Sequence, residues 1–430
     1  MKQTGIRSTL RCTRSLHMQF GIAVLVQLGI TATTCSQENN WPQFLGIHRN
    51  GISAETGLID KWPDKGPKVI WRSKGGVGMS GLAIDRGSLI TMVQIGDEQQ
   101  VLALNAKTGE ELWRTAVAPA YENPQGDGPR ATPNIDGEAV YVYTGEGVLA
   151  SLNFNTGKLA WSHDVVKEHD GKPSDYGMSC SPLVVGDQVI VCAGAPDATV
   201  VAYHKKSGEV AWKTGDGPAG YASPTLLKIG ERQQIVAFVG AEVLGLEPGS
   251  GQVLWSYPYE TDFACNTASP ISVDGNVFIS AGENHGSTML AIEEAAGELS
   301  AKEVWASLGP RSAMRNEWQT SILLDGFLYG LDNVGGAGPI TNLVCLNSKT
   351  GEQVWIERRF GKGNLIAAEG KLFISTLNGE LVVVRATPDG YQEIGRKNVV
   401  GKTRQAPALA NGLLYLRDEK EIICLDVRKQ

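Results

Sequence analysis

The sequence predicts an all-β protein, an eight-bladed β-propeller in which an N-terminal strand closes the last blade. Two recurring phrases indicate this fold. The first is a Thr-Gly or Ser-Gly pair whose Gly precedes Trp by four positions, in copies beginning at Thr108, Thr156, Ser207, Ser250 and Thr350. The second, in register with the first, is a small residue with Ser or Thr before Pro, followed by two apolar runs around a tight turn. The Trp spacing of about 40 to 50 residues is the size of a four-stranded blade.

Each repeat is expected to contain four strands. Turn pairs such as Asp136-Gly137 and Asn411-Gly412 supply the positive φ that two-residue hairpins need. β-Branched and aromatic runs such as Val277-Phe278-Ile279 flank these turns. The order within a unit is therefore strand, tight turn, strand, loop, strand, Thr-Gly turn and Trp strand.

The two ends of the chain fit one another. The eighth unit stops at Val427 without a Trp strand, whereas Val69-Ile70-Trp71 precedes the first complete unit. We expect this N-terminal strand to complete the last blade, because closure removes the free sheet edges of an open array.

Two units are irregular, and the repeated Trp has a structural interpretation. The sixth copy is stretched between Gly297 and Trp305, and the seventh unit has Ile394 in place of Trp. A large aromatic side chain repeated once per blade is expected to pack as a wedge between neighbouring sheets. Cysteines also follow the repeat rather than a disulfide framework: Cys345 and Cys424 occupy a position filled elsewhere by Ala103, Ser151, Ala202, Gly245 and Ala291.

Three segments are predicted along the 430 residues: a signal peptide or lipoprotein leader over 1–36, an N-terminal extension over 37–65 and the propeller over 66–430. In the leader, basic residues precede an apolar stretch from Met18 to Ala32, which is short for a membrane span. We therefore expect an exported protein of the periplasm or cell envelope.

Lipidation of the leader remains open from the sequence. Cys35 is the candidate for a lipid anchor, but Thr34 precedes it where a lipobox has Gly, Ala or Ser, so cleavage close to Ser36 is the alternative. Membrane contact is expected only if Cys35 is lipidated. The net charge of −7 argues against nucleic acid as a partner.

The repeats resemble the PQQ-like (pyrroloquinoline-quinone-like) propeller family, which includes quinoprotein alcohol dehydrogenases and the β-barrel assembly lipoprotein BamB. The resemblance lies in the Leu-x-x-x-x-Thr-Gly-x-x-x-Trp phrases and the Ser-Pro hairpins, over roughly residues 60 to 430. The opening Trp41-Pro42-Gln43-Phe44, Arg49-Asn50-Gly51 and Trp62-Pro63 resembles leaders of secreted members from planctomycete-type bacteria, which often have Arg in place of Leu45. The resemblance implies the fold and says little about activity, because many such propellers bind no quinone.

The dehydrogenase members imply an enzymatic alternative with PQQ and calcium. They hold Ca²⁺ with a carboxylate and an amide, for which the candidates are Glu317 beside Asn316 and Asp332 beside Asn333. They also carry a disulfide between adjacent cysteines, which this sequence lacks. We therefore predict no cofactor, no catalytic residue and no metal ligand. The segment 163–170, with two His and three acids, is interpreted as a loop between blades.

Polar residues that precede each innermost strand are expected to ring one mouth of the central channel. Arginines, amides and aromatic rings in a concave mouth suit ligand binding, although any propeller channel needs a hydrated lining. The predicted ligand-binding residues are Arg130, Tyr176, Tyr221, Asn266, Asn316, Glu317, Trp318, Gln319 and Arg404. Arg130 and Arg404 are expected to face the channel, where each guanidinium can hold a carboxylate or sugar acid by paired hydrogen bonds.

The leading functional interpretation is a non-catalytic binding or scaffold propeller outside the cytoplasm. Its partner would be a protein, or a small acidic or sugar ligand, at the channel mouth. A PQQ-dependent dehydrogenase of alcohols or sugars is one alternative, and a carbohydrate-active propeller that uses the Arg and Tyr residues of the mouth is another.

Overall fold

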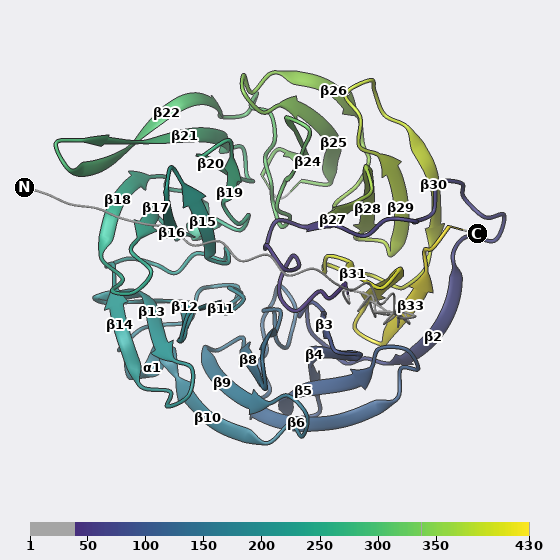
Figure 1. Ribbon diagram of the computed structural model, residues 1–430, viewed down its shortest axis with the longest axis horizontal. Coiled ribbons are helices and arrows are strands. Elements are labelled where there is room, and N and C mark those ends of the chain that lie inside the picture. Colours follow the sequence, from purple (N-terminus) through teal and green to yellow (C-terminus); the bar gives the residue numbers. More distant parts are fainter. Residues whose placement is uncertain (1–38, 337, 430) are drawn as a thin grey trace, which may run out of the picture. The chain divides into compact units, whose positions relative to one another are not determined.

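The structure is a computed structural model that describes residues 39–336 and 338–429, and the predicted leader with Cys35 lies outside the described residues. The described chain forms a ring of eight four-stranded antiparallel sheets around a channel (Figure 1). The first four blades, each from the channel outward, are β3 (Ala83–Asp85), β4 (Ser88–Ile95), β5 (Glu98–Asn105) and β6 (Glu111–Pro119); β7 (Asn134–Asp136), β8 (Ala139–Tyr143), β9 (Val148–Asn153) and β10 (Leu159–Asp164); β11 (Leu183–Val185), β12 (Gln188–Ala195), β13 (Ala198–His204) and β14 (Val210–Thr214); β15 (Thr225–Ile229), β16 (Arg232–Phe238), β17 (Glu242–Leu246) and β18 (Val253–Pro258).

The other four blades follow in the same order. They are β19 (Ile271–Val273), β20 (Asn276–Ala281), β21 (Gly286–Ala295) and β22 (Glu298–Leu308); β23 (Ile322–Leu324), β24 (Phe327–Val334), β25 (Ile340–Asn347) and β26 (Gln353–Glu357); β27 (Gly363–Ala368), β28 (Lys371–Thr376), β29 (Glu380–Arg385) and β30 (Glu393–Asn398); β31 (Ala408–Ala410), β32 (Leu413–Arg417), β33 (Glu421–Asp426) and β2 (Lys68–Lys74). The predicted all-β, eight-bladed propeller is confirmed.

Among the residues that the structure describes, helical structure is confined to single turns. The helix α1 (Val165–Glu168) lies within the segment expected to be only a loop, and a 3₁₀ turn spans Asp262–Ala264. None of the helices in the described part of the chain is long and apolar enough to cross a membrane.

The N-terminal strand closes the ring as predicted. The strand β2 pairs antiparallel with β33, and Trp71 stands opposite Cys424. The last blade therefore joins residues from both ends of the described chain, and β2 gives it the fourth, outermost strand that the other blades have.

Tryptophans link neighbouring blades by packing on glycines. Five such contacts recur around the ring, each from the outer strand of one blade to the Thr-Gly or Ser-Gly turn of the next: Trp71 on Gly109, Trp113 on Gly157, Trp161 on Gly208, Trp212 on Gly251 and Trp305 on Gly351. A β carbon on these glycines would lie 2.2 to 3.0 Å from the indole atoms. Each glycine also has a φ between 69° and 75°. Glycine is thus required both for the turn and for the contact, and the predicted wedge packing is confirmed for these five tryptophans.

The indole N–H groups strengthen these junctions. Trp71 donates to the carbonyl of Ala106 at 2.9 Å and Trp355 to that of Thr387 at 2.8 Å, each in the following blade. The small residue of the repeat stands opposite the Trp: Cys345 faces Trp355 across β25 and β26. These thiols therefore sit where space is short beside the indole.

One part of the repeat alignment was wrong. In the fifth blade Met289, not Ala291, pairs with Trp305. The cause is the long hairpin β21–β22, which projects beyond the ring in Figure 1 and adds residues before the Trp. Its outer strand packs beside β18, where the Tyr257 hydroxyl donates to Glu303. The extra length of this hairpin therefore covers the rim of the fourth blade.

The N-terminal extension crosses the channel end of the propeller and leaves between blades seven and eight. Trp41 bridges to Ile84, and β1 (Ile52–Ser53) adds a parallel strand to the inner edge of β27. The guanidinium of Arg49 is buried and donates to the carbonyls of Ser181 at 2.9 Å and Pro182 at 3.0 Å. Figure 1 shows this purple segment running over the centre of the ring. The extension is thus integrated into the propeller.

The extension also packs a tryptophan against the irregular seventh blade. Trp62 lies against Gly395 of β30, where a β carbon would come within 2.2 Å of the indole. This blade lacks a Trp in its own outer strand and has Ile394 instead. A tryptophan from another part of the chain therefore supplies the missing aromatic packing.

Alanine at Gly251 is expected to destabilise the fold more than alanine at Gly275. Both glycines have positive φ, of 70° and 85°, but only Gly251 lies against a tryptophan, whereas Gly275 faces open space. The control variant Gly275→Ala should cost about 1 kcal/mol from backbone strain. Gly251→Ala should cost about 1–3 kcal/mol more because its methyl group meets Trp212. Denaturant unfolding measures both, and equal losses would remove the proposed role of the contact.

The pH dependence of stability should report how the extension is anchored. Glu369 accepts hydrogen bonds from Lys371 at 2.7 Å and from the backbone N–H groups of Gly57 and Leu58 at 2.9 and 2.8 Å. These contacts, Lys371 first, lower the pKa of Glu369 from 4.5 to about 2. A carboxyl group with a depressed folded pKa stabilises the fold above its ordinary pKa, and that contribution is lost as pH falls through the folded value.

Glu369→Gln should therefore lower the melting temperature at pH 7. The difference from wild type should shrink as the pH falls from about 4.5 toward 2. Thermal unfolding across this range tests the anchor. A difference that stays constant with pH would show that the charge of Glu369 does not hold the extension.

Candidate functional site

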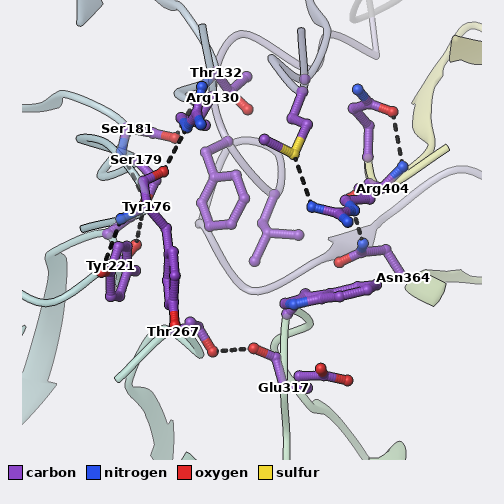
Figure 2. A pocket seen from close by; sticks show the side chains of 18 of the residues that line it. Arg130, Thr132, Tyr176, Ser179, Ser181, Tyr221, Thr267, Glu317, Asn364 and Arg404 are labelled. Carbon is purple, nitrogen blue, oxygen red and sulfur yellow. Dashed lines mark hydrogen bonds between the residues drawn. The ribbon is translucent and has the colours of Figure 1, made fainter. Parts of the chain in front are cut away.

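A cavity of about 280 Å³ occupies the channel, and the extension forms its floor. Trp41, Phe44 and Leu45 supply the apolar surface of this floor. Loops that lead into the innermost strands form the wall, as the labelled side chains of Figure 2 show. The extension was not recognised as part of a site from the sequence, although its aromatic and apolar residues were visible there.

Six of the nine residues predicted at the mouth line this cavity. They are Arg130, Tyr176, Tyr221, Glu317, Trp318 and Arg404. The wall also contains Met79 and Gln125, which the sequence did not single out. Whether the lining binds a ligand stays a prediction.

The three predicted amides do not line the cavity, which corrects the expectation. Asn266 donates to the carbonyls of Val239 at 2.6 Å and Tyr259 at 3.1 Å. Asn316 and Gln319 both donate to the carbonyl of Leu331, at 3.2 and 3.1 Å. All three are buried, because loop backbone that leaves the sheets needs internal hydrogen-bond partners.

The guanidinium of Arg130 is used within the protein. Its Nε donates to the carbonyl of Tyr176 at 2.7 Å, Nη2 to that of Gly126 at 2.6 Å, and Nη1 to that of Gly128. It also lies over the ring of Tyr121, 4.7 Å from the centroid. Burial lowers the pKa of Arg130 to about 10. Arg130 therefore ties two loops together and has little capacity left for a ligand.

Arg404, at the corresponding position of the eighth blade, is in a different state. Only its Nη1 has hydrogen-bond partners among the described residues, the carbonyl of Gln125 at 2.6 Å and the sulfur of Met79 at 3.5 Å. Its guanidinium lies 4.8 Å from the centroid of Trp318. Burial lowers the pKa of Arg404. The two predicted arginines thus differ in how many of their donors the protein already uses.

Glu317 is already paired with a cation. The Nζ of Lys362 lies 2.7 Å from both carboxylate oxygens and 4.8 Å from the centroid of Trp318. Burial raises the pKa of Glu317, and the Lys362 contact partly opposes that rise. The hydroxyl of Thr267 donates to the Glu317 carbonyl, so the loop backbone is fixed as well.

Aromatic rings form one side of the mouth. Tyr176 stacks on Tyr221 with centroids 5.6 Å apart, and Phe263 lies 6.3 Å from Tyr176. Phe263 is 63% exposed and has a φ of 57°. Such a backbone conformation in a bulky residue is uncommon and often occurs at functional sites.

The other acid-amide pair is structural. Asp332 receives hydrogen bonds at 2.7 Å from both Nε and Nη2 of Arg315, and both side chains are 5% exposed. Asn333 donates to the carbonyl of Gly338 and the hydroxyl of Thr341. In the second-blade segment, His163 contacts Glu168 at 3.0 Å. These contacts give each group a partner within the protein.

A family model described as outer membrane protein assembly factor BamB matches residues 64–170 and 97–357. The chain belongs to this family. Outer membrane protein assembly factor BamB of Yersinia pestis is 21% identical over 295 residues, which cover 66% of this chain and 71% of that protein. The quinoprotein alcohol dehydrogenase PedH of Pseudomonas putida is 31% identical over 137 residues, 30% of this chain and 22% of the enzyme.

Solved structures share the fold. Quinohemoprotein alcohol dehydrogenase from Comamonas testosteroni has a TM-score of 0.67 at 15% identity, covering 91% of this chain and 81% of that one. BamB from Moraxella catarrhalis has a TM-score of 0.58 at 14% identity, covering 83% of this chain and 100% of that one. Both an assembly factor and an enzyme therefore share this architecture, and the residues of the site must distinguish them.

The two arginines should differ in their effects on stability. Arg130→Gln removes donors from three backbone carbonyls, so we expect it to lower stability by about 2–4 kcal/mol. Arg404→Gln removes one such donor and should cost about 1 kcal/mol or less. Thermal unfolding of the two matched variants measures this, and equal losses would contradict the assignment.

Proposed function

We propose that this BamB-family chain is a non-catalytic binding or scaffold propeller that works outside the cytoplasm and receives its partner or ligand at the channel mouth. The observation that carries this proposal is the cavity, which is lined by residues of the extension and by loops that lead into the innermost strands. A cavity with apolar and polar surfaces together is typical of a binding site.

Family membership supports the same function. BamB of Yersinia pestis is named as an outer membrane protein assembly factor and matches most of this chain. Export to the envelope, inferred from the leader, would place the two proteins in a comparable setting. The exposed Phe263 at the mouth gives a protein partner an apolar contact beside the cavity.

The dehydrogenase alternative meets an obstacle in the charges of the site. Both carboxylates that it would need for calcium already have cationic partners: Glu317 pairs with Lys362 and Asp332 with Arg315. A hard cation there would have to displace an ammonium or a buried guanidinium. These carboxylates therefore do not fit the calcium ion that the quinone would need, and we derive no reaction through either group.

Photocrosslinking in cells tests the proposed binding face. A photoreactive p-benzoylphenylalanine replaces Phe263 at the mouth, and the matched control replaces Val354 on the outer strand β26, which is also exposed. We expect a specific adduct from position 263 that exceeds any adduct from position 354. Adducts from the outer strand alone would place the partner on the rim and contradict the proposal.

Calorimetry with PQQ and Ca²⁺ tests the alternative, followed by alcohol and sugar oxidation assays. We expect no calcium-dependent binding below the micromolar range. Tight binding that is lost in Glu317→Gln would overturn the non-catalytic proposal.

A further inference from the structure

We propose that the cavity binds a small apolar acid, whose carboxylate is held by the Nε and Nη2 edge of Arg404 and whose apolar body rests on the floor formed by the extension. This inference rests on the proposed function, because it names the ligand class of the same cavity.

The first step concerns the unused edge of Arg404. The carbonyl of Gln125 and the sulfur of Met79 occupy Nη1. Within residues 39–336 and 338–429, Nε and Nη2 donate no hydrogen bond to protein. Neither atom is fully buried without a hydrogen-bond partner, in contrast to the Nε of Arg49. Arg404 lines the cavity, and Figure 2 shows it directed inward. Two donors are therefore accessible on one edge.

The second step is the use of the same edge elsewhere in the molecule. Arg315 holds Asp332 through Nε and Nη2, both at 2.7 Å. Arg428 holds Asp426 in the same way at 2.8 and 2.5 Å. This geometry is general, because the two N–H groups are parallel and match the two oxygens of a carboxylate. An open edge of this kind is sufficient by itself to hold a carboxylate through two parallel hydrogen bonds.

The third step is electrostatic. Arg404 is partly buried and stacked on Trp318, and burial lowers its pKa. The nearby carboxylate of Glu317 is engaged by Lys362 and makes no hydrogen bond to Arg404. A bound anion would compensate a guanidinium charge that the protein leaves without a hydrogen-bonded acid.

The fourth step is the floor. Trp41 and Leu45 are 3% and 4% exposed and, with Phe44, present apolar surface to the cavity. The volume of about 280 Å³ is close to the lower end of ligand pockets. A ligand that packs on these apolar residues and also pairs with Arg404 is small, with one apolar end and one carboxylate.

Calorimetry with a matched pair of probes tests this assignment. The acid is 3-phenylpropionate and its neutral control is 3-phenylpropionamide. We expect the acid to bind roughly 10- to 100-fold more tightly, as hydrogen bonds to a charged group imply. A second pair of probes, N-acetylphenylalanine and its amide, resembles the C-terminus of a peptide. The affinity of this pair shows whether the cavity also binds the terminal carboxylate of a peptide.

Variants assign the contacts. Arg404→Gln should abolish the preference for the acid, and Arg404→Lys should restore only part of it because a lysine lacks the paired donors. Leu45→Ala should weaken acid and amide by a similar factor. Arg396→Gln is the control, since Arg396 uses the same edge on Glu393 at an exposed site of β30.

The outcomes separate this inference from the proposed function. Equal binding of acid and amide, or unchanged acid binding in a folded Arg404→Gln variant, overturns the carboxylate assignment while the cavity remains a binding site. Failure of both probes at millimolar concentration also overturns the inference, and an adduct from position 263 would then still support a partner at the mouth. Acid binding that depends on Arg404, without a photocrosslinked adduct from position 263, supports the inference. It contradicts a protein partner at the mouth.

Discussion

The ring depends on tryptophans that lie against glycines of the neighbouring blade. Indole atoms fill the space where a β carbon would stand, so the interface cannot accept a larger residue at Gly157 or Gly251. The contact of Trp71 with Gly109 is the most consequential of the set, because Trp71 belongs to the N-terminal strand and joins the last blade to the first. The contact between Trp71 and Gly109 therefore both packs two blades together and closes the ring. The closed ring in turn surrounds the channel.

Closure has a consequence for the channel. The chain before β2 must cross from the centre of the ring to its rim, and it is held on the way by Arg49, by β1 and by Glu369. Hydrogen bonds to charged groups and a strand pairing are local restraints on this crossing. The extension therefore converts an open channel into a cavity with a floor, and the same segment that closes the fold shapes the site.

Charged groups around the cavity differ in how far the protein already pairs them. The carboxylate of Glu317, which lines the cavity, is already paired with Lys362. The guanidinium of Arg130 donates its hydrogen bonds to backbone carbonyls, whereas only the Nη1 of Arg404 donates to a carbonyl of the described chain. The open edge of Arg404 above apolar residues of the extension supports the proposed ligand, an anion with an apolar body.

The sequence by itself determined the architecture. Trp and Gly recur at a fixed spacing because every blade packs on the next in the same way, so the number of blades, the closure by Trp71 and the position of the mouth could be predicted. The contents of the mouth were decided by tertiary structure. Asn316 and Gln319 are polar and correctly placed along the chain, but they turn to the carbonyl of Leu331 rather than to the cavity. The floor comes from residues far from the loops in sequence, and no local pattern shows which end of the channel they cover. Side-chain direction and long-range crossing depend on hydrogen-bond partners that only the folded chain brings together.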